Sequence, residues 1–162
     1  MKAFKFLAAG ARGPLSRVAW PAVGEWLITD GPVIGKRGAH ACTDEQLAHW
    51  LHDELWEVEL AGAQLAGPDC VVSERARLVR RVVAWNADGA LRFAAACIDH
   101  ARAQAGADAA LLADASDALR QGYPAIAAYT AALAIAHDDE AAYASERRRQ
   151  SAWIVRELVD RV

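Results

Sequence analysis

The pattern of apolar and polar positions changes near the middle of the chain. Residues 1 to 72 hold short apolar runs separated by glycines and by four of the five prolines. From residue 86 onward alanine dominates, with charged residues spaced between the alanines. Short runs bounded by turn residues are typical of strands, and the second pattern is typical of packed helices. The sequence therefore predicts a single α+β domain, residues 1–162, with a strand- and turn-rich half (1–85) and a helical half (86–162).

The first half is expected to form a small antiparallel sheet with one helix. Residues 3–8, 25–29 and 55–60 are predicted strands, and a further apolar segment, 39–42, follows a glycine turn. In the strand 55–60, Trp56, Val58 and Leu60 alternate with Glu57 and Glu59, so the tryptophan side is predicted to face the core. Residues 62–69 are expected to form a loop.

One helix is predicted inside this half. Thr43 and Gln46 match a capping box, which starts a helix that is expected to end near residue 53. This helix should bury Leu47, Trp50 and Leu51. Residues 74–84 fit either a helix or a strand. We favour a short strand at residues 71–72, followed by a helix that Ser73 caps.

The second half is expected to be an alanine-rich helical bundle. Helices are predicted at residues 86–105, 108–121 and 124–137, and a last one runs from residue 138 or 139 to about 161. Asparagine, aspartate or proline marks each start, and Gly106 and Gly122 close the first two helices.

Composition and charge narrow the function classes. The net charge of −3 and the isoelectric point near 5.9 argue against a nucleic-acid binder. The three cysteines are widely spaced and odd in number, which indicates free thiols rather than a disulfide framework. The apolar run at the start is too short for a signal peptide, and no run is long enough to span a membrane. We therefore expect a cytoplasmic protein.

Three histidines and a cysteine lie close together in residues 40–52. His40, Cys42, His49 and His52 carry ligand atoms that suit zinc, but their spacing matches no standard zinc motif. We expect no metal and no cofactor, and keep these four residues as the metal candidates. His40, in a glycine turn beside Cys42, is a candidate general acid or base because imidazole titrates near neutral pH. The alternative is a histidine that fixes the turn through backbone hydrogen bonds.

Carboxylates, arginines and tryptophans supply the other candidates. Glu57 and Glu59 share a strand face, where they either divide acid and base roles or are simply solvated. Clustered guanidinium groups recognise phosphate or carboxylate, or form salt bridges. Six tryptophans indicate a core and, if a few line a cleft, a small-molecule pocket. The candidate binding residues are Trp26, Trp50, Trp56, Arg75, Arg77 and Arg80.

Several short motifs follow one another in the first half. The chain begins Met1-Lys2-Ala3-Phe4-Lys5 and continues with Gly38-Ala39-His40-Ala41-Cys42, Trp56-Glu57-Val58-Glu59 and the basic segment 71–80. This order resembles an uncharacterised bacterial and phage domain family, a domain of unknown function whose members begin MKAYK and carry a GFHAC-like motif and an EVE strand. The resemblance covers residues 1–83 and implies an actinobacterial version with an added helical half. It implies no activity, and Ala39 stands where an aromatic residue usually precedes the histidine.

Residues 38–50 are also similar to the core segment of some ADP-ribosyltransferase-like folds. That likeness implies an acidic catalytic residue, for which Glu57 or Glu59 is available. The arginine or histidine expected on the first strand is missing, since only Lys2 and Lys5 lie there.

The sequence contains no assembled catalytic motif, so we expect a cytoplasmic binding or interaction module. The alternative is a small-molecule enzyme with a site around His40 at the sheet–helix junction. The expected partner is a small molecule or a protein, including a second copy of the chain packed through the alanine-rich helices as a homo-oligomer. Nucleic acid and membrane are not expected partners.

Overall fold

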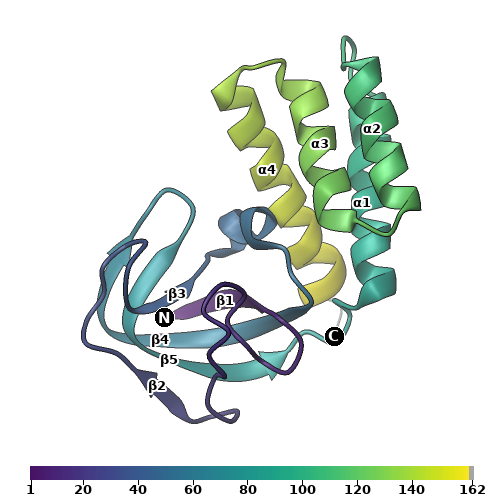
Figure 1. Cartoon of the computed structure of the whole chain (residues 1–162). Coiled ribbons are helices and arrows are strands. Elements are labelled where there is room, and N and C mark those ends of the chain that lie inside the picture. The colour runs from purple at the N-terminus through teal and green to yellow at the C-terminus, as the bar shows by residue number, and fades with distance from the viewer. Residues whose placement is uncertain (161–162) are drawn as a thin grey trace. The chain divides into compact units, whose positions relative to one another are not determined.

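The computed structural model describes residues 1–160 and divides the chain where its composition changes. Its contacts form two compact units, one from Met1 to Trp85 and one that begins at Asn86. The first unit holds an antiparallel sheet of five strands, and the second is helical (Figure 1). The predicted α+β fold with a helical C-terminal half is therefore confirmed. That the two halves make a single domain stays a prediction.

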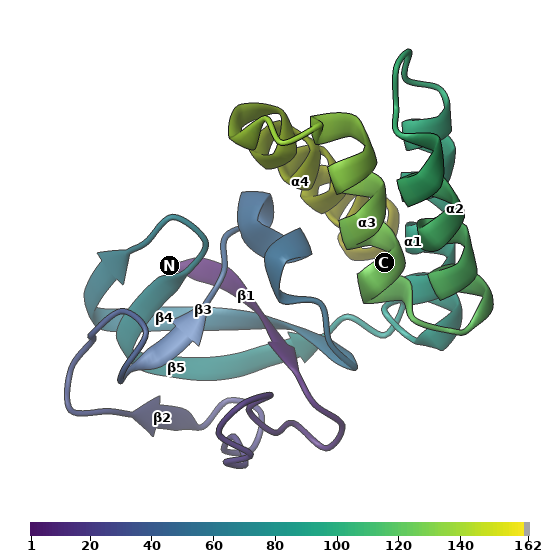
Figure 2. The ribbon, with the colours of Figure 1, turned by 45° about the horizontal axis from the view of Figure 1, so that its top comes forward.

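The sheet curls and closes on itself. Its order is β1-β4-β5-β2, and β3 pairs with β5, so that β2 and β3 both lie along β5. Directly after β3, Cys42 exchanges two backbone hydrogen bonds of 2.8 Å with Phe4 of β1. In Figure 2, β1 and β3 are seen in front of the long β4–β5 hairpin. The strands are β1 (Lys2–Leu7), β2 (Trp26–Ile28), β3 (Ala39–Ala41), β4 (Glu54–Ala66) and β5 (Val71–Arg81).

We call the face of the sheet that carries its main apolar cluster the inner face. Since side chains alternate along a strand, β1 contributes positions 3, 5 and 7 to this face. The buried residues of the cluster are Ala3, Leu7, Ala39, Ala41, Val58, Leu60, Val71, Ala76 and Leu78, and Trp56 packs against them. The predicted orientation of β4, with Trp56, Val58 and Leu60 toward the core, is confirmed.

The expectation of a helix after residue 73 is wrong, because β5 runs as a strand through this segment. Residues 74–78 alternate in burial, with Ala76 and Leu78 buried and Arg75 exposed, which is the period of a strand. The neighbouring β4 supplies partners for most of the segment. Its pairing skips from Arg80 to Leu78, so that Val79 forms a bulge.

The expectation of a loop at residues 62–69 is also wrong in part, because β4 continues to Ala66. The pairing is irregular between Ala61 and Gln64, where Gly62 has a φ of +77°. A side chain at Gly62 would collide with the carboxylate of Glu74, which instead accepts a hydrogen bond from the Ala63 amide. Glycine therefore lets the strand pass this point and extend the hairpin.

The predicted helix after Thr43 is a short 3₁₀ helix, η1 (Asp44–Trp50). The capping box is present, and the Thr43 amide donates to the Gln46 side chain at 2.9 Å. Leu47 is fully buried as expected, whereas Trp50 is 37% exposed and Leu51 is only partly buried. The expectation that Trp50 is buried by this helix is therefore wrong.

The helical unit is an antiparallel bundle that follows the predicted starts and stops (Figure 1). Asn86, Asp108 and Asp139 cap α1, α2 and α4 with their side chains, and Pro124 opens α3. The predicted end of the last helix near residue 161 lies outside the described residues. The helices are α1 (Ala87–Arg102), α2 (Ala109–Arg120), α3 (Pro124–Ala136) and α4 (Glu140–Ile154), followed by the π-helical turn η2 (Val155–Val159).

Candidate functional site

A cavity of about 740 Å³ lies within the first unit, between the curled sheet and the segments that follow β1 and β3. Its walls come from the segments 13–20 and 35–42, without Arg17 and Arg37, and from residues 49–52, together with Lys5, Phe6, Leu27 and Cys70. Trp20, Leu27 and Trp50 supply large apolar surfaces. This volume is within the range of pockets that hold small molecules, which is roughly 300–1,000 Å³.

Lys5 is the charged side chain of β1 on the inner face. It stands between Ala3 and Leu7, which are both buried in the apolar cluster. Burial lowers the pKa of the Lys5 ammonium below its ordinary value of 10.5, and the neighbouring Cys42 and Cys70 oppose this only in part. Within residues 1–160, no carboxylate forms an ion pair with Lys5. The cavity therefore contains an amine without a counter-ion.

Two buried thiols lie near that amine. Burial raises the pKa of the Cys42 thiol to about 12, and the thiol donates a hydrogen bond of 3.4 Å to the Phe4 carbonyl. The pKa of Cys70 is also raised, by burial and by the adjacent Asp69. Both sulfur atoms therefore stay protonated at neutral pH and are poor nucleophiles.

His40 forms hydrogen bonds with the backbone of the glycine turn before β3. Its Nε2 accepts a hydrogen bond of 3.1 Å from the Gly35 amide, and its Nδ1 lies 3.1 Å from the Gly38 carbonyl, to which it donates. Gly38 has a φ of +107°, and a side chain there would collide with Val72. Both ring nitrogens are thus engaged with the backbone, as expected of a histidine that fixes the turn. Its role as a general acid or base stays a prediction.

The other residues of the histidine-rich segment line the cavity without forming a metal centre. Trp50 donates its indole N–H to the Asp69 carbonyl at 2.5 Å, and His52 Nδ1 accepts from the Asp53 amide at 2.9 Å. His49 is exposed. Nowhere in residues 1–160 do three or more His, Cys, Asp or Glu side chains come together as a metal would need.

The predicted carboxylates and arginines lie on the opposite face of the sheet. We call this the ionic face. Glu57 accepts from Arg80 at 2.5 Å and lies 3.4 Å from the Lys2 ammonium. Burial alone would raise the pKa of Glu57, but the Arg80 hydrogen bond and the Lys2 charge outweigh it and hold this pKa below its usual range. The face consists of Lys2, Trp26, Glu57, Glu59, Arg75, Arg77 and Arg80.

The same face pairs Glu59 with an arginine and an indole. Arg77 donates to Glu59 through Nε at 2.8 Å and Nη2 at 2.5 Å. Its guanidinium centre lies 4.7 Å from the Trp26 ring, and that of Arg75 lies 5.7 Å from it. These arginines therefore already have partners inside the sheet, and none of the ionic-face residues lines the cavity.

Trp56, the remaining binding candidate, belongs to a structural contact. Its indole N–H donates to Glu54 at 3.0 Å, and the same carboxylate accepts from the Gly10 and Ala11 amides. Burial alone would raise the pKa of Glu54, but these hydrogen bonds and the charge of Arg81 outweigh it and hold this pKa below its ordinary value. Glu54 thereby fixes the turn after β1.

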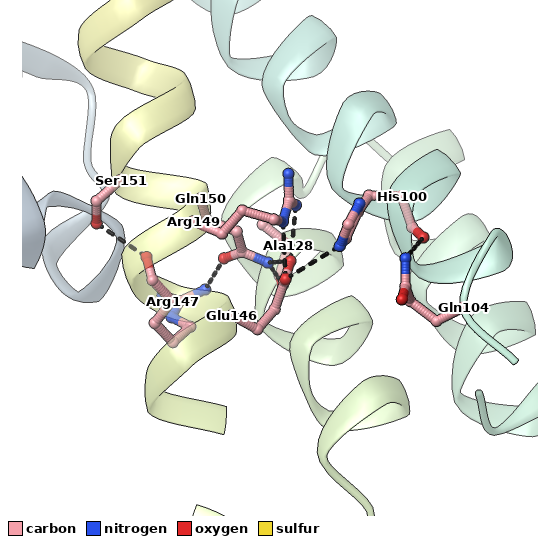
Figure 3. Close-up of polar contacts among 8 residues, drawn as sticks. All are labelled: His100, Gln104, Ala128, Glu146, Arg147, Arg149, Gln150 and Ser151. Atoms are coloured by element: carbon pink, nitrogen blue, oxygen red, sulfur yellow. Dashed lines mark hydrogen bonds and ion pairs between the residues drawn. The ribbon is translucent and has the colours of Figure 1, made fainter. Parts of the chain in front are cut away.

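The helical unit contains its own buried polar cluster (Figure 3). Glu146 of α4 accepts two hydrogen bonds of 2.7 Å from Arg149 and faces Nε2 of His100, on α1, at 3.5 Å. Gln150 donates to Glu146 and, at 2.9 Å, to the carbonyl of Ala128 on α3. The cluster links three helices of the bundle.

The structure thus separates the predicted site residues into two sets and leaves Trp56 in a structural contact with Glu54. His40, Cys42, His49, Trp50 and His52 line the cavity, and the ionic-face residues satisfy one another. Sequence reasoning missed Lys5, Trp20 and Cys70 as cavity residues. The available signal was the run Ala3-Phe4-Lys5-Phe6-Leu7, in which apolar residues flank a lysine on both faces of a strand.

The comparisons with known proteins add no relative. No family model, curated protein or solved structure matches the chain. Among residues 1–160, no helix is both long enough and apolar enough to cross a membrane.

Proposed function

We propose that residues 1–85 form a small-molecule-binding module, whose cavity takes a ligand with an apolar body and an anionic group. The observation that supports this most directly is the Lys5 amine, which lies in the cavity wall without a counter-ion. A ligand carboxylate would supply the missing charge next to the half-buried amine, where the charge-assisted hydrogen bond is stronger than one between neutral groups.

The charge of the cavity favours the same kind of ligand. Its lining includes Lys5, Lys36 and three histidines, and contains no aspartate or glutamate. This contrasts with the whole chain, whose net charge is −3. Trp20, Leu27 and Trp50 would contact the apolar part of the ligand.

The proposal includes a location in the cytoplasm. Cys42, Cys70 and Cys97 are all free thiols, which is the usual state in a reducing compartment. We also propose that the first half belongs to the bacterial and phage domain family that it resembles. A homo-oligomer packed through the helices is part of the proposal too.

The test is calorimetric titration with 4-methylbenzoate, with the neutral 4-methylbenzamide as its matched probe. We expect the carboxylate to bind and the amide to bind more weakly. Lys5→Met should weaken carboxylate binding at least tenfold, which corresponds to about 1.4 kcal/mol. Lys2→Met, on the ionic face, is the control and should change nothing. Equal binding of the acid and the amide, or equal affinity of wild type and Lys5→Met, would overturn the proposal.

A further inference from the structure

The chemistry of Lys5 goes beyond that of a positive charge. The chain contains 15 arginines but only three lysines, at positions 2, 5 and 36. Its partly buried ion pairs on the ionic face and in the helical cluster use arginine for most of the cations, for example Arg80 and Arg149. Arginine stays protonated in proteins, whereas a buried lysine loses its proton readily. The cation in the cavity, Lys5, is therefore one that can lose its proton and become a neutral amine.

The surroundings of Lys5 favour that neutral form. Ala3 and Leu7 flank it on the inner face, and no acidic side chain lines the cavity. Burial without a counter-ion lowers the pKa of the ammonium, so the fraction of free amine near neutral pH exceeds that of an exposed lysine. A desolvated lysine in an apolar pocket is an activated nucleophile toward carbonyl compounds.

The other nucleophiles near Lys5 are suppressed by the same environment. Burial raises the pKa of Cys42 to about 12 and also raises that of Cys70, so that both stay thiols. The thiolate is the reactive form of cysteine. Compared with these two thiols, the Lys5 amine is therefore the group better able to attack a carbonyl carbon.

We propose that Lys5 binds aldehyde ligands covalently, as an imine between its Nζ and the carbonyl carbon. This inference rests on the proposed function, because the ligand must first enter the cavity. The amine lone pair forms the C–N bond and the carbonyl π pair moves to oxygen. A proton then passes from nitrogen to oxygen to give the carbinolamine. Loss of water from the carbinolamine leaves the C=N bond. Amine plus aldehyde give imine plus water, with no oxidant or reductant.

A ligand that carries both an aldehyde and a carboxylate suits the cavity best. The aldehyde would react at Lys5, while the carboxylate would interact with Lys36 and with histidines of the lining, such as His49 and His52. The full-length protein is therefore incubated with 4-carboxybenzaldehyde, and cyanoborohydride reduces any imine to a stable secondary amine. Peptide mapping by mass spectrometry then compares the modified fraction at each amine.

The other two lysines of the chain are internal controls. Lys2 is 63% exposed and lies on the ionic face, and Lys36 is an exposed residue of the cavity lining. At neutral pH we expect Lys5 to be modified at least tenfold faster than either. Excess 4-methylbenzoate, which has the same shape but no aldehyde, should slow the reaction at Lys5 and leave Lys2 unaffected.

Lys5→Arg separates covalent from ionic binding, because arginine keeps the charge and forms no imine under these conditions. We expect this variant to bind 4-methylbenzoate but to give no adduct at position 5. Modification of Lys5 no faster than of Lys2, in a protein that still binds 4-methylbenzoate, would overturn the imine and leave the proposed function standing. If the wild-type protein does not bind 4-methylbenzoate, the proposed function itself is overturned. The comparison among lysines uses wild-type protein, so it does not depend on the folding of any variant.

Discussion

Replacing Lys5 with methionine should make the first unit more stable. The side chain stands between Ala3 and Leu7 on the inner face, with no carboxylate paired to it among the described residues. Methionine is unbranched and flexible, so it fills a similar space without a charge. Mutational data put the cost of burying a polar group without compensation at about 1–3 kcal/mol. We expect the free energy of unfolding of Lys5→Met to exceed that of wild type by that amount near neutral pH. A gain of ~1 kcal/mol raises the melting temperature of a small domain by about 4–8 °C.

The gain should depend on pH in a defined direction. In the unfolded chain Lys5 keeps its proton up to its ordinary pKa of 10.5, whereas burial lowers this pKa in the folded state. Between the two values the unfolded state binds more protons, so the stability of the wild type rises with pH. The stability gain of Lys5→Met over wild type is therefore full below the pKa that Lys5 has in the folded state. The gain shrinks as the pH rises from there toward 10.5.

The difference in the free energy of unfolding between wild type and Lys5→Met is measured by urea unfolding. Tryptophan fluorescence reports on the first unit, because five of the six tryptophans precede residue 86. The matched control is Lys36→Met, which removes an exposed lysine from the cavity lining and should change stability by less than about 0.5 kcal/mol. A less stable Lys5→Met protein at neutral pH would refute the reasoning. So would an advantage that is equally large at pH 7 and near pH 10.

Three further predictions concern the paired and buried groups. Glu57→Gln should cost about 1.5–3 kcal/mol in urea unfolding, because it removes the carboxylate to which Arg80 donates. That cost should shrink below pH 4.5 and vanish as the pH falls through the lowered pKa of Glu57, so a cost that persists in acid would contradict it. Glu146→Gln should cost about 1.5–3 kcal/mol in the helical unit, because it removes the buried carboxylate to which the half-buried Arg149 donates, and thermal loss of helical circular dichroism measures it. Burial raises the pKa of Cys97 to about 12, so Ellman's reagent should find no rapidly reacting thiol in the native protein and three in urea. A rapid native phase would show that one cysteine is accessible.

The helical half was predictable because its signals are local. Asn86, Asp108 and Asp139 cap helices from positions immediately before them, and Pro124 supplies the first residue of another. Such signals depend on a few neighbouring residues and act wherever the segment lies. The bounds of these helices therefore follow from the sequence to within a few residues.

The segment 73–81 was not predictable in the same way. Its arginines and Ser73 fit a capped helix when they are considered alone, and its strand conformation depends on pairing with β4. Glu57 and Glu59, which lie far away in the sequence, supply partners for Arg80 and Arg77. A strand that is stabilised by distant partners gives a weak local signal.

The cavity could not be predicted from the sequence for a related reason. It exists because the sheet closes through Cys42 and Phe4, which brings three separate segments around the inner face. No single segment carries the pattern of a pocket. His40 and Trp50 stood out as unusual residues in the sequence, whereas Lys5, which also lines the cavity, did not.

Lys2 and Lys5 show how one strand places one amine in an ion-pair network and another amine outside it. The two residues are three positions apart, so their side chains point to opposite faces of β1. Lys2 lies over the Phe4 ring and pairs with Glu57, and thus takes part in a network that the sheet completes by itself. Lys5 has the same amine, but it lies among apolar residues and thiols, where the described chain supplies no opposite charge. A half-buried charge without an ion-pair partner among the described residues costs stability, and the carboxylate of the proposed ligand would offset that cost.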